Sequence, residues 1–501
     1  MKNNKNFYIT TSIAYVNWVP HLWHALEDVL ADSINRAQKL FWKNTRFWTW
    51  TDEHWIKIFK KAEELWMSAQ EMCDINSWKF KDLKNSLNIW FDNFIRTTDQ
   101  EKHWPSVQKM WEKLEEKWDI YKKHYDWKYC EWCEAYLSEK DLIDWKCEIH
   151  KKEPVLISEE NYFFKLSKYS DQILDLLKTD KLKIVPSFRK NEIMKMLEWE
   201  GLKDVSFSRP KKSLPWWVPV PWDENQNMYV WCDALTNYIS ALDYKNNWEN
   251  FEKYWNNAEV VHSIWKDIVR FHAWIWIWML LSAGIKVPEI IHIHWFLTSN
   301  WEKMSKSTWN VVDPVEYIEK YWSERLRYFL LREVPTWRDW DFTHSQFVNI
   351  CNAHLSNWLW NLVNRISVMS KKNWVEKIWK SDEKWNFTLK NFEEKVKKTW
   401  KNFEEKISMD FKNYDTCWAL IEAWELVEFW NKQMDELKPW LIKKDENLWW
   451  EEKFIEVMQN FLELMKEIWK ILEPFIPETS GKILEIYESW EPEILFERIE
   501  E

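Results

Sequence analysis

Glycine is almost absent from this chain: only Gly201, Gly284 and Gly481 occur among its 501 residues. Ordinary proteins contain about 7% glycine, because tight turns and helix ends need a residue that adopts positive φ without a steric cost. Tryptophan is abundant instead, with 46 residues. The chain must therefore make its turns with bulky side chains, unless tryptophan stands where glycine belongs.

Many tryptophans occupy positions where turn chemistry favours glycine. Trp18, Trp127, Trp301 and Trp309, for example, each follow a short polar residue of the kind that starts a turn. Dozens of exposed indoles would also form apolar patches that folded proteins avoid. We therefore interpret most of the tryptophans as glycines encoded by UGA and read under the wrong genetic code. Peptide masses from the native organism would test this interpretation.

Length and charge exclude several classes of protein. A chain of 501 residues exceeds one ordinary core, so three or four packed units are expected. The net charge of −11 is opposite to that of a basic nucleic-acid coat, and any RNA contact must be local. The most apolar span, 271–285, is too short to cross a bilayer, and no secretory leader opens the chain. We expect a cytoplasmic protein that contacts no membrane.

The first part of the chain has the pattern of a parallel α/β sheet. A β-rich segment, 7–13, leads through a turn into a long helical pattern, and a second strand is expected near 45–49. This order is typical of a Rossmann-like domain. A Cys/His cluster and a helical stretch around 161–177 then interrupt it, and strands are expected again at 228–231 and 258–264. The sheet is therefore predicted to be split by an insertion.

The remainder of the chain is predicted to be helical. From about Ser345, heptad-like apolar spacing dominates over 347–369, 419–437 and 454–475, with few β-rich runs. We expect these segments to form a separate all-α bundle.

A cysteine and histidine cluster has the spacing of a zinc site. Two residues separate Cys130 from Cys133 and Cys147 from His150, and thirteen lie between the two pairs. Three thiolates and an imidazole with these gaps match tetrahedral Zn²⁺. Four protein ligands close the coordination shell, so we expect one structural zinc ion that stabilises the insertion. The seven cysteines thus indicate metal binding in a reducing compartment rather than a disulfide framework.

Two distant motifs suit a nucleoside triphosphate. His21 and His24 lie where the first strand meets its helix, so imidazoles and a helix N-terminus could face phosphate oxygens. The second motif, 303–307, carries Lys303 and Lys306, which could follow the charge that develops on a departing pyrophosphate. A His-x-x-His motif alone is more often a pair of helix-surface residues, so the interpretation depends on both motifs together.

Together the two motifs resemble the paired signatures of class I aminoacyl-tRNA synthetases. In that family the first motif reads His-(Ile/Leu)-Gly-His, which this chain matches only if Trp23 is glycine. A wider match over 7–11, 51–54, 229–238 and 266–272 is similar to the methionyl-tRNA synthetase family along nearly the whole chain. The family has tryptophan at four positions that we therefore expect to be genuine: Trp111, Trp216, Trp231 and Trp440.

The resemblance implies a two-step reaction. The carboxylate of L-methionine would attack the α-phosphate of ATP, and the methionyl group would then pass to the terminal adenosine of tRNA(Met), initiator tRNA included. Mg²⁺ would accompany the nucleotide. Catalysis would come from His21, His24, Lys303 and Lys306.

The resemblance also implies the residues of each binding site. Asp52 would contact the ammonium group of methionine, and soft, aromatic-lined surroundings suit its sulfur. The rest of the methionine pocket would be Ile13, Tyr15, Trp231, Ala234, Leu235, Tyr238, Ile268 and His272. ATP would be bound by His21, Trp23, His24, Asp267, Lys303, Ser305 and Lys306, with Asp267 near the ribose and Trp265 standing for a glycine. The anticodon would be read by Asn361, Arg365 and Trp440.

Position 23 is critical in this scheme, because adenine would lie against its backbone. An indole there would occupy the place of the nucleotide, so the site should bind ATP only with glycine at this position.

The resemblance divides the chain into five parts. These are the first half of the Rossmann catalytic domain (1–115), a connective insertion with the zinc knuckle (116–225), the second half of the catalytic domain (226–300), the Lys-Met-Ser-Lys-Ser loop with a stem-contact region (301–345) and a helical anticodon-binding domain (346–501). The chain ends at Glu501 without a β-rich RNA-binding module, so a monomer is expected.

Three alternatives stay open at this point. A class I synthetase for isoleucine, valine, leucine or cysteine would share both motifs, and a nucleotidyltransferase of the same fold would share the first. A non-catalytic RNA-binding paralogue would keep the fold but lose the nucleotide site. Methionine-dependent exchange of pyrophosphate with ATP separates these cases.

Overall fold

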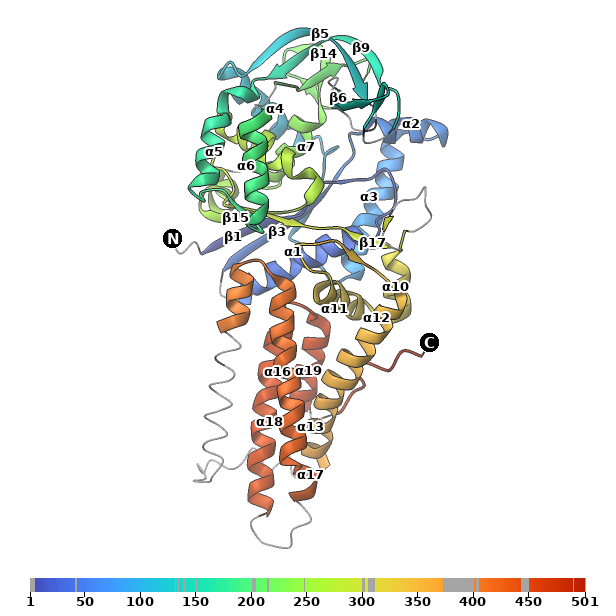
Figure 1. Ribbon diagram of the computed structural model, residues 1–501, viewed down its shortest axis with the longest axis vertical. Helices are drawn as coiled ribbons and strands as arrows, with labels where there is room; N and C mark the ends of the chain where they lie inside the picture. Colours follow the sequence, from blue (N-terminus) through green and yellow to red (C-terminus); the bar gives the residue numbers. More distant parts are fainter. Residues whose placement is uncertain are drawn as a thin grey trace.

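The computed structural model describes residues 5–40, 43–130, 132, 135–137, 141–148, 151–200, 204–213, 216–246, 248–299, 302–304, 311–372, 401, 405–442, 450–489 and 491–500. The molecule is elongated, with an α/β body at one end and a bundle of long helices at the other (Figure 1). Helix α1 (Leu22–Leu40) lies where the two meet. Among the described residues, no helix is both long and apolar enough to span a bilayer.

A parallel sheet organises the α/β body. Its strand order is β10-β16-β15-β1-β3-β2, with β4 also paired to β3, and the pairings between these strands are parallel. Buried apolar runs such as Phe7, Tyr8 and Ile9 are typical of strands covered on both faces. The strands are β1 (Asn6–Thr10), β2 (Ala14–Tyr15), β3 (Asn44–Asp52), β4 (Asn93–Arg96), β10 (Lys183–Val185), β15 (Ala258–Trp265) and β16 (Ile290–His294). The parallel α/β sheet expected from the sequence is confirmed.

Helices cover the sheet and connect its strands. Ser68 begins one of them with a capping box, in which its hydroxyl accepts from the Glu71 N–H and the Glu71 carboxylate accepts in return. Besides α1, these helices are α2 (Ile56–Glu64), α3 (Ala69–Ser86), α4 (His103–Glu116), α5 (Ser170–Lys178), α6 (Phe188–Glu200), α7 (Val230–Ser240), α8 (Trp248–Phe251) and α9 (Ile277–Ala283).

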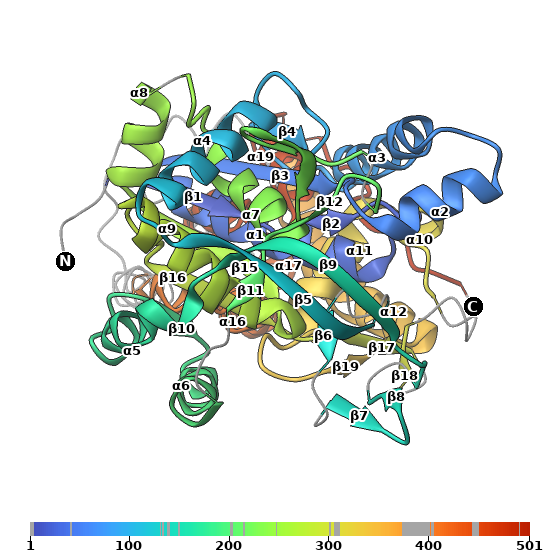
Figure 2. The same cartoon turned by 90° about the horizontal axis from the view of Figure 1, so that it is seen from above.

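Antiparallel strands form a second layer within the range expected for the insertion. Figure 2 shows the long strands β5 (Ile120–Cys130) and β9 (Val155–Phe164) lying side by side above the parallel sheet. Their sheet has the order β11-β9-β5-β6, and a three-stranded sheet has the order β12-β14-β13. The shorter strands are β6 (Ala135–Leu137), β7 (Leu142–Ile143), β8 (Lys146–Cys147), β11 (Val205–Ser206), β12 (Ser208–Pro210), β13 (Pro219–Val220) and β14 (Asp223–Met228). Strand β10 comes from the same range of the chain but joins the parallel sheet through β16.

Two local predictions were correct only in part. The helical stretch expected around 161–177 begins at Leu166 with a 3₁₀ turn that leads into α5, because the preceding residues pair in β9 as far as Phe164. The strand expected at 228–231 ends at Met228, the last residue of β14, and α7 begins at Val230 with Tyr229 as its N-cap. β-Rich composition favoured a strand at that point, but Asp233 in the first turn suits the positive end of a helix.

A short three-stranded sheet and three helices connect the body to the bundle. The sheet has the order β18-β17-β19 and consists of β17 (Leu297–Ser299), β18 (Glu302–Lys303) and β19 (Trp340–Asp341). The helices are α10 (Pro314–Tyr321), α11 (Ser323–Glu333) and α12 (His344–Ile350). Helix α10 begins with Asp313 as the N-cap and proline at its first position, an arrangement that favours a helix start.

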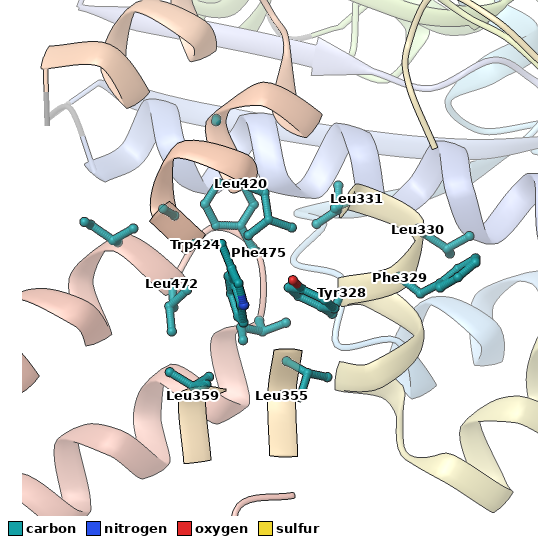
Figure 3. Packing of buried hydrophobic residues seen from close by; sticks show 14 of the residues in the cluster. Tyr328, Phe329, Leu330, Leu331, Leu355, Leu359, Leu420, Trp424, Leu472 and Phe475 are labelled. Carbon is teal, nitrogen blue, oxygen red and sulfur yellow. The ribbon is translucent and has the colours of Figure 1, made fainter. Parts of the chain in front are cut away.

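The bundle confirms the three helical segments expected after Ser345. It contains a π-helical stretch (Cys351–Trp360), α13 (Asn361–Lys372), α16 (Thr416–Leu437), α17 (Pro439–Ile442), α18 (Trp450–Leu472) and α19 (Pro477–Ser489). Helix α11 joins its core, where Tyr328 lies against Trp424 and near Leu355, Leu359 and Phe475 (Figure 3). This shared apolar core fixes the bundle to the α/β body.

Candidate active site

A cavity of about 180 Å³ lies beside the carboxyl ends of the parallel strands. Eight of the nine residues expected around methionine line it together: Ile13, Tyr15, Asp52, Trp231, Ala234, Leu235, Ile268 and His272. They come from the segment after β1, the end of β3, helix α7 and the segment after β15. Binding sites of open parallel sheets form at this edge.

Tyr238, the ninth residue, supports the cavity from behind. Its hydroxyl lies 2.5 Å from Nε2 of His272, whose Nδ1 lies 2.9 Å from the carbonyl oxygen of Ile268. A carbonyl can only accept, so Nδ1 donates to it and Nε2 accepts from the tyrosine hydroxyl. Burial lowers the pKa of His272 to about 4, with partial compensation from that carbonyl. The imidazole is therefore neutral near pH 7, and both of its nitrogens are occupied.

Four further residues line the cavity that the sequence did not indicate: Trp55, Trp132, Val230 and Phe271. Val230 and Phe271 lie next to predicted residues within the matching motifs. Their position in the sequence could therefore have identified them as lining residues. Phe271 stacks on Trp231, with ring centroids 3.8 Å apart. Trp132 lies between the two cysteines of the first metal-ligand pair, so nothing in the sequence placed it here.

The loop that carries Asp52 is braced on both sides. Asp52 is 1% exposed and its Oδ1 accepts the backbone N–H of His54 at 3.1 Å. Glu53, next to it, accepts from Arg96 at 2.6 and 3.0 Å. The His54 ring bonds to Asp233 at 2.5 Å. These contacts fix the carboxylate of Asp52 at the cavity wall.

The His-x-x-His motif opens helix α1. The His21 and His24 rings lie 4.2 Å apart between centroids, and Nδ1 of His24 accepts the backbone N–H of His21 at 3.1 Å. Nε2 of a neutral His24 therefore carries the proton and acts as a donor, which suits a phosphate oxygen. Trp23 between them is buried, stacks on Phe296 with centroids 4.6 Å apart, and donates its indole N–H to the Leu297 carbonyl at 2.5 Å.

The second motif starts close to the first. Lys303 lies in β18 and pairs with Thr298 of β17, the residue after the carbonyl that Trp23 contacts. Ser305 and Lys306 lie outside the described residues. Asp267 is exposed in a short 3₁₀ turn directly after β15, at the same edge of the sheet. The described parts of the two motifs therefore lie close together, on either side of the contact between Trp23 and β17.

The structure describes two of the four predicted zinc ligands, Cys130 and Cys147. Cys130 ends β5 and Cys147 lies in β8, and both are buried in one small cluster with Leu137. Cys133 and His150 lie outside the described residues. Within the described part of the chain, no group of three or more metal-ligating side chains is found.

Two of the three predicted anticodon residues, Arg365 and Trp440, are in contact at the far end of the bundle. Asn361 is exposed at the start of α13, and one turn later the Arg365 guanidinium lies 4.7 Å above the Trp440 ring. Arg365 also bonds to Asp435 at 2.9 Å. Helices α13 and α17 reach the end of the molecule away from the sheet (Figure 1).

Known proteins match this chain over nearly all of its length. A family model described as "tRNA synthetases class I (M)" matches residues 7–141 and 130–367. Proteins named methionine–tRNA ligase from Fusobacterium nucleatum and Caldanaerobacter subterraneus are 37% and 39% identical over 480 and 485 residues, each covering 96% of this chain and 74% of the relative. A solved structure of Mycobacterium tuberculosis methionyl-tRNA synthetase in complex with methionyl-adenylate superposes with a TM-score of 0.89 at 34% identity, covering 96% of this chain and 93% of that one.

These matches decide between the alternatives left open by the sequence. These proteins match both the α/β body and the bundle, and all of them are methionine-specific. A synthetase for another amino acid and a nucleotidyltransferase are therefore both excluded. The chain belongs to the methionine–tRNA ligases, the methionine-specific members of the class I tRNA synthetases.

Proposed function

We propose that the cavity beside Asp52 is the methionine site of this ligase. The observation that carries this proposal is the convergence of eight expected residues on one apolar cavity with one buried carboxylate in its wall. The carboxylate of Asp52 would bind the substrate's ammonium group, a charge-assisted contact. The aromatic walls, His272 among them, would surround the thioether, because sulfur packs well against ring edges.

The phosphates of ATP would lie between the two motifs. His21 and His24, at the N-terminus of α1, would donate to oxygens of the α-phosphate as the methionine carboxylate attacks it. Lys303 and Lys306 would neutralise the leaving pyrophosphate, Ser305 would contact the nucleotide, and Asp267 would bind the ribose. Mg²⁺ would be held mainly by the triphosphate oxygens. The pairing of β18 with β17 beside Trp23 supports this arrangement.

We propose a structural zinc ion held by Cys130, Cys133, Cys147 and His150. Burial of Cys130 and Cys147 in one cluster supports it, since the two pairs are far enough apart in sequence that only the fold brings them together. The ion would stabilise the insertion and take no part in the reaction.

The far end of the bundle would read the anticodon of tRNA(Met), initiator tRNA included. Asn361, Arg365 and Trp440 offer an amide, a guanidinium and an indole face, which suit hydrogen bonding to base edges and stacking. The stacked Arg365 and Trp440 support this role, because their contact preorganises both groups. The five-part division of the chain given above, action as a monomer and location in the cytoplasm are proposed with it.

We propose further that most tryptophans are glycines in the native protein. Trp66 and Trp118 follow helices α2 and α4 with φ of 57° and 58°, and each donates its N–H to the carbonyl three residues before. Gly284 ends α9 with φ of 68° and the same bond. Residues with a side chain rarely adopt this backbone conformation, and glycine is the usual residue at such helix ends. Trp66 and Trp118 are 97% and 81% exposed, so packing of the indole does not compensate.

Turns between strands support the same proposal. Asp144 and Trp145 form the two-residue loop between β7 and β8 with φ of 50° and 64°, a conformation for which Asp-Gly is the preferred sequence. Pro221 and Trp222 connect β13 to β14 with φ of 67° at Trp222, where a turn with leading proline favours glycine. Under native decoding, Trp23 would also be glycine, and the space that its indole fills beside Phe296 would be open to adenine.

Methionine-dependent exchange of pyrophosphate with ATP tests the site, using the full chain expressed under its native genetic code. We expect Lys303→Ala to reduce the rate of exchange by at least about a hundredfold while methionine affinity stays within about twofold, because the lysine acts on the leaving group. Equal exchange rates in variant and parent would remove Lys303 from this role. Glu64→Gln, on the exposed surface of α2, serves as the control and should leave exchange unchanged.

A further inference from the structure

A carboxylate is buried behind the cavity between two imidazoles. Asp233 is fully buried, and its oxygens lie 2.5 Å from Nδ1 of His54 and 2.7 Å from Nε2 of His103. The other ring nitrogen of His103 lies 2.9 Å from the Ser240 hydroxyl. None of these four residues lines the cavity, so direct contact with substrate does not explain the cluster.

The cluster joins two elements that line the cavity to helix α4, which packs against α7 and supplies no lining residue. Asp233 is in the first turn of α7, the helix that supplies Val230, Trp231, Ala234 and Leu235 to the cavity wall, and His103 begins α4. His54 lies in the loop after β3, two residues beyond Asp52. Asp233 therefore fixes the Asp52 loop relative to α7, which also lines the cavity.

The contact between this loop and Asp52 runs through the backbone. The N–H of His54 donates to Oδ1 of Asp52 at 3.1 Å, so the orientation of one peptide group determines the direction of that carboxylate. The His54 ring is held by Asp233, and among the described residues its Nε2 has no hydrogen-bond partner. Without Asp233 the ring would lose this bond, and the peptide group would be restrained only from its Glu53 side, where the carbonyl accepts from the Trp55 N–H among the described residues.

The electrostatics of Asp233 strengthen this connection. Burial by itself would raise the pKa of its carboxyl group, but the charge of His54 and hydrogen bonds from His103 and His54 outweigh burial and lower the pKa to about 2. The group is therefore ionised near pH 7. An ionised acceptor makes shorter and stronger hydrogen bonds than a neutral one, and it holds its donors more rigidly.

We propose that Asp233 is a positioning residue for amino-acid recognition: by holding His54, it keeps the Asp52 carboxylate directed at the ammonium group of methionine. The proposal rests on the ammonium-binding role proposed for Asp52. It predicts a defect confined to the ammonium group, which a general distortion of the cavity would not produce.

Two methionine analogues separate these possibilities in calorimetric titrations of the full chain expressed under its native genetic code. L-Methioninol keeps the ammonium group and the thioether, whereas 4-(methylthio)butanoate keeps the thioether and lacks the ammonium group. We expect Asp233→Asn to weaken methioninol about tenfold, corresponding to about 1.4 kcal/mol, and to leave the butanoate within about twofold. The KM for methionine in pyrophosphate exchange should rise by the same factor, with the KM for ATP unchanged. Equal loss for both analogues, or no loss for methioninol, would overturn the proposal.

Matched variants complete the test. Asp119 is another fully buried carboxylate, bonded to Lys168, Tyr169 and Ser282, and Asp119→Asn should lower stability without changing either affinity. Asp52→Asn tests the underlying role: if it leaves methioninol binding intact, the proposed function of Asp52 fails. If it weakens methioninol while Asp233→Asn does not, only the present inference fails.

A second route covers the case in which Asp233→Asn does not accumulate as folded protein. His103→Gln removes one of the two imidazoles that hold Asp233 and leaves His54 in place. It should weaken methioninol selectively, by a smaller factor than Asp52→Asn. Unchanged affinity for methioninol in a folded His103→Gln protein would overturn the proposal.

Discussion

At Trp222 the side chain conflicts with the backbone conformation. Its φ of 67° lies in the left-handed region, and its indole is 87% exposed, so the strain is not offset by packing. Such a conformation costs about 1–2 kcal/mol for a residue with a Cβ atom. Trp111 is the opposite case, since it is 1% exposed and packs edge-on against Tyr162.

We therefore predict opposite effects of glycine at these two positions. Trp222→Gly should raise the free energy of unfolding by about 1 kcal/mol, because it removes backbone strain. Trp111→Gly should lower it by about 3–5 kcal/mol, because it leaves a cavity in the core. Chemical denaturation of both variants measures the difference. A destabilised Trp222→Gly protein would contradict the assignment of glycine to that turn.

Helix α1 is buried on all sides, although it carries several charged residues. Asp32 accepts from Arg36 at 2.9 Å and lies 2.7 Å from Arg327 of α11. Arg327 also donates to the carbonyl of Phe475 at 2.9 Å, and Arg36 to Glu473 at 3.1 Å, both in the turn between α18 and α19. The helix that presents the His-x-x-His motif is thus tied to the bundle through one shared carboxylate.

Asp32→Asn tests this connection. The change keeps the shape of the side chain but removes the charge that two buried arginines share, so we expect the free energy of unfolding to fall by about 3 kcal/mol or more. Glu64→Gln breaks the exposed pair with Lys61 on α2 and should cost less than about 1 kcal/mol. Denaturant titrations compare the two. A loss for Asp32→Asn as small as that of the control would show that Asp32 does not hold α1 in place.

Local patterns were sufficient to predict most elements but not their exact partners. The apolar run at 258–264 predicted β15 and the heptad spacing predicted α16 and α18, because one face or both faces of these elements are buried. The start of α7 was missed, because the aromatic and β-branched residues there favour a strand in isolation. Only tertiary contacts select the helix at this position. Asp233 was missed for a different reason: its role depends on His54 and His103, which only the fold brings to it.

The whole molecule places the proposed sites for chemistry and for RNA recognition far apart. The cavity and the described parts of both motifs proposed to bind phosphate lie in the α/β body, while α13 and α17 carry Arg365 and Trp440 to the opposite end of the bundle (Figure 1). Between them, α11 and α16 share an apolar core in which Tyr328 contacts Trp424 (Figure 3). A change at the far end of the bundle should therefore affect tRNA charging and leave methionine activation intact.

Trp440→Ala provides this test. Stacking of one base on an aromatic ring is worth about 1–3 kcal/mol, so kcat/KM for tRNA(Met) should fall by roughly tenfold or more. Methionine-dependent pyrophosphate exchange should stay within about twofold, because it needs no tRNA and the cavity is distant. Leu441→Ala, at the exposed neighbouring position of α17, is the control and should leave both activities unchanged. Equal losses in exchange and charging would mean that the bundle acts on the catalytic body itself, through the Asp32 and Arg327 contacts.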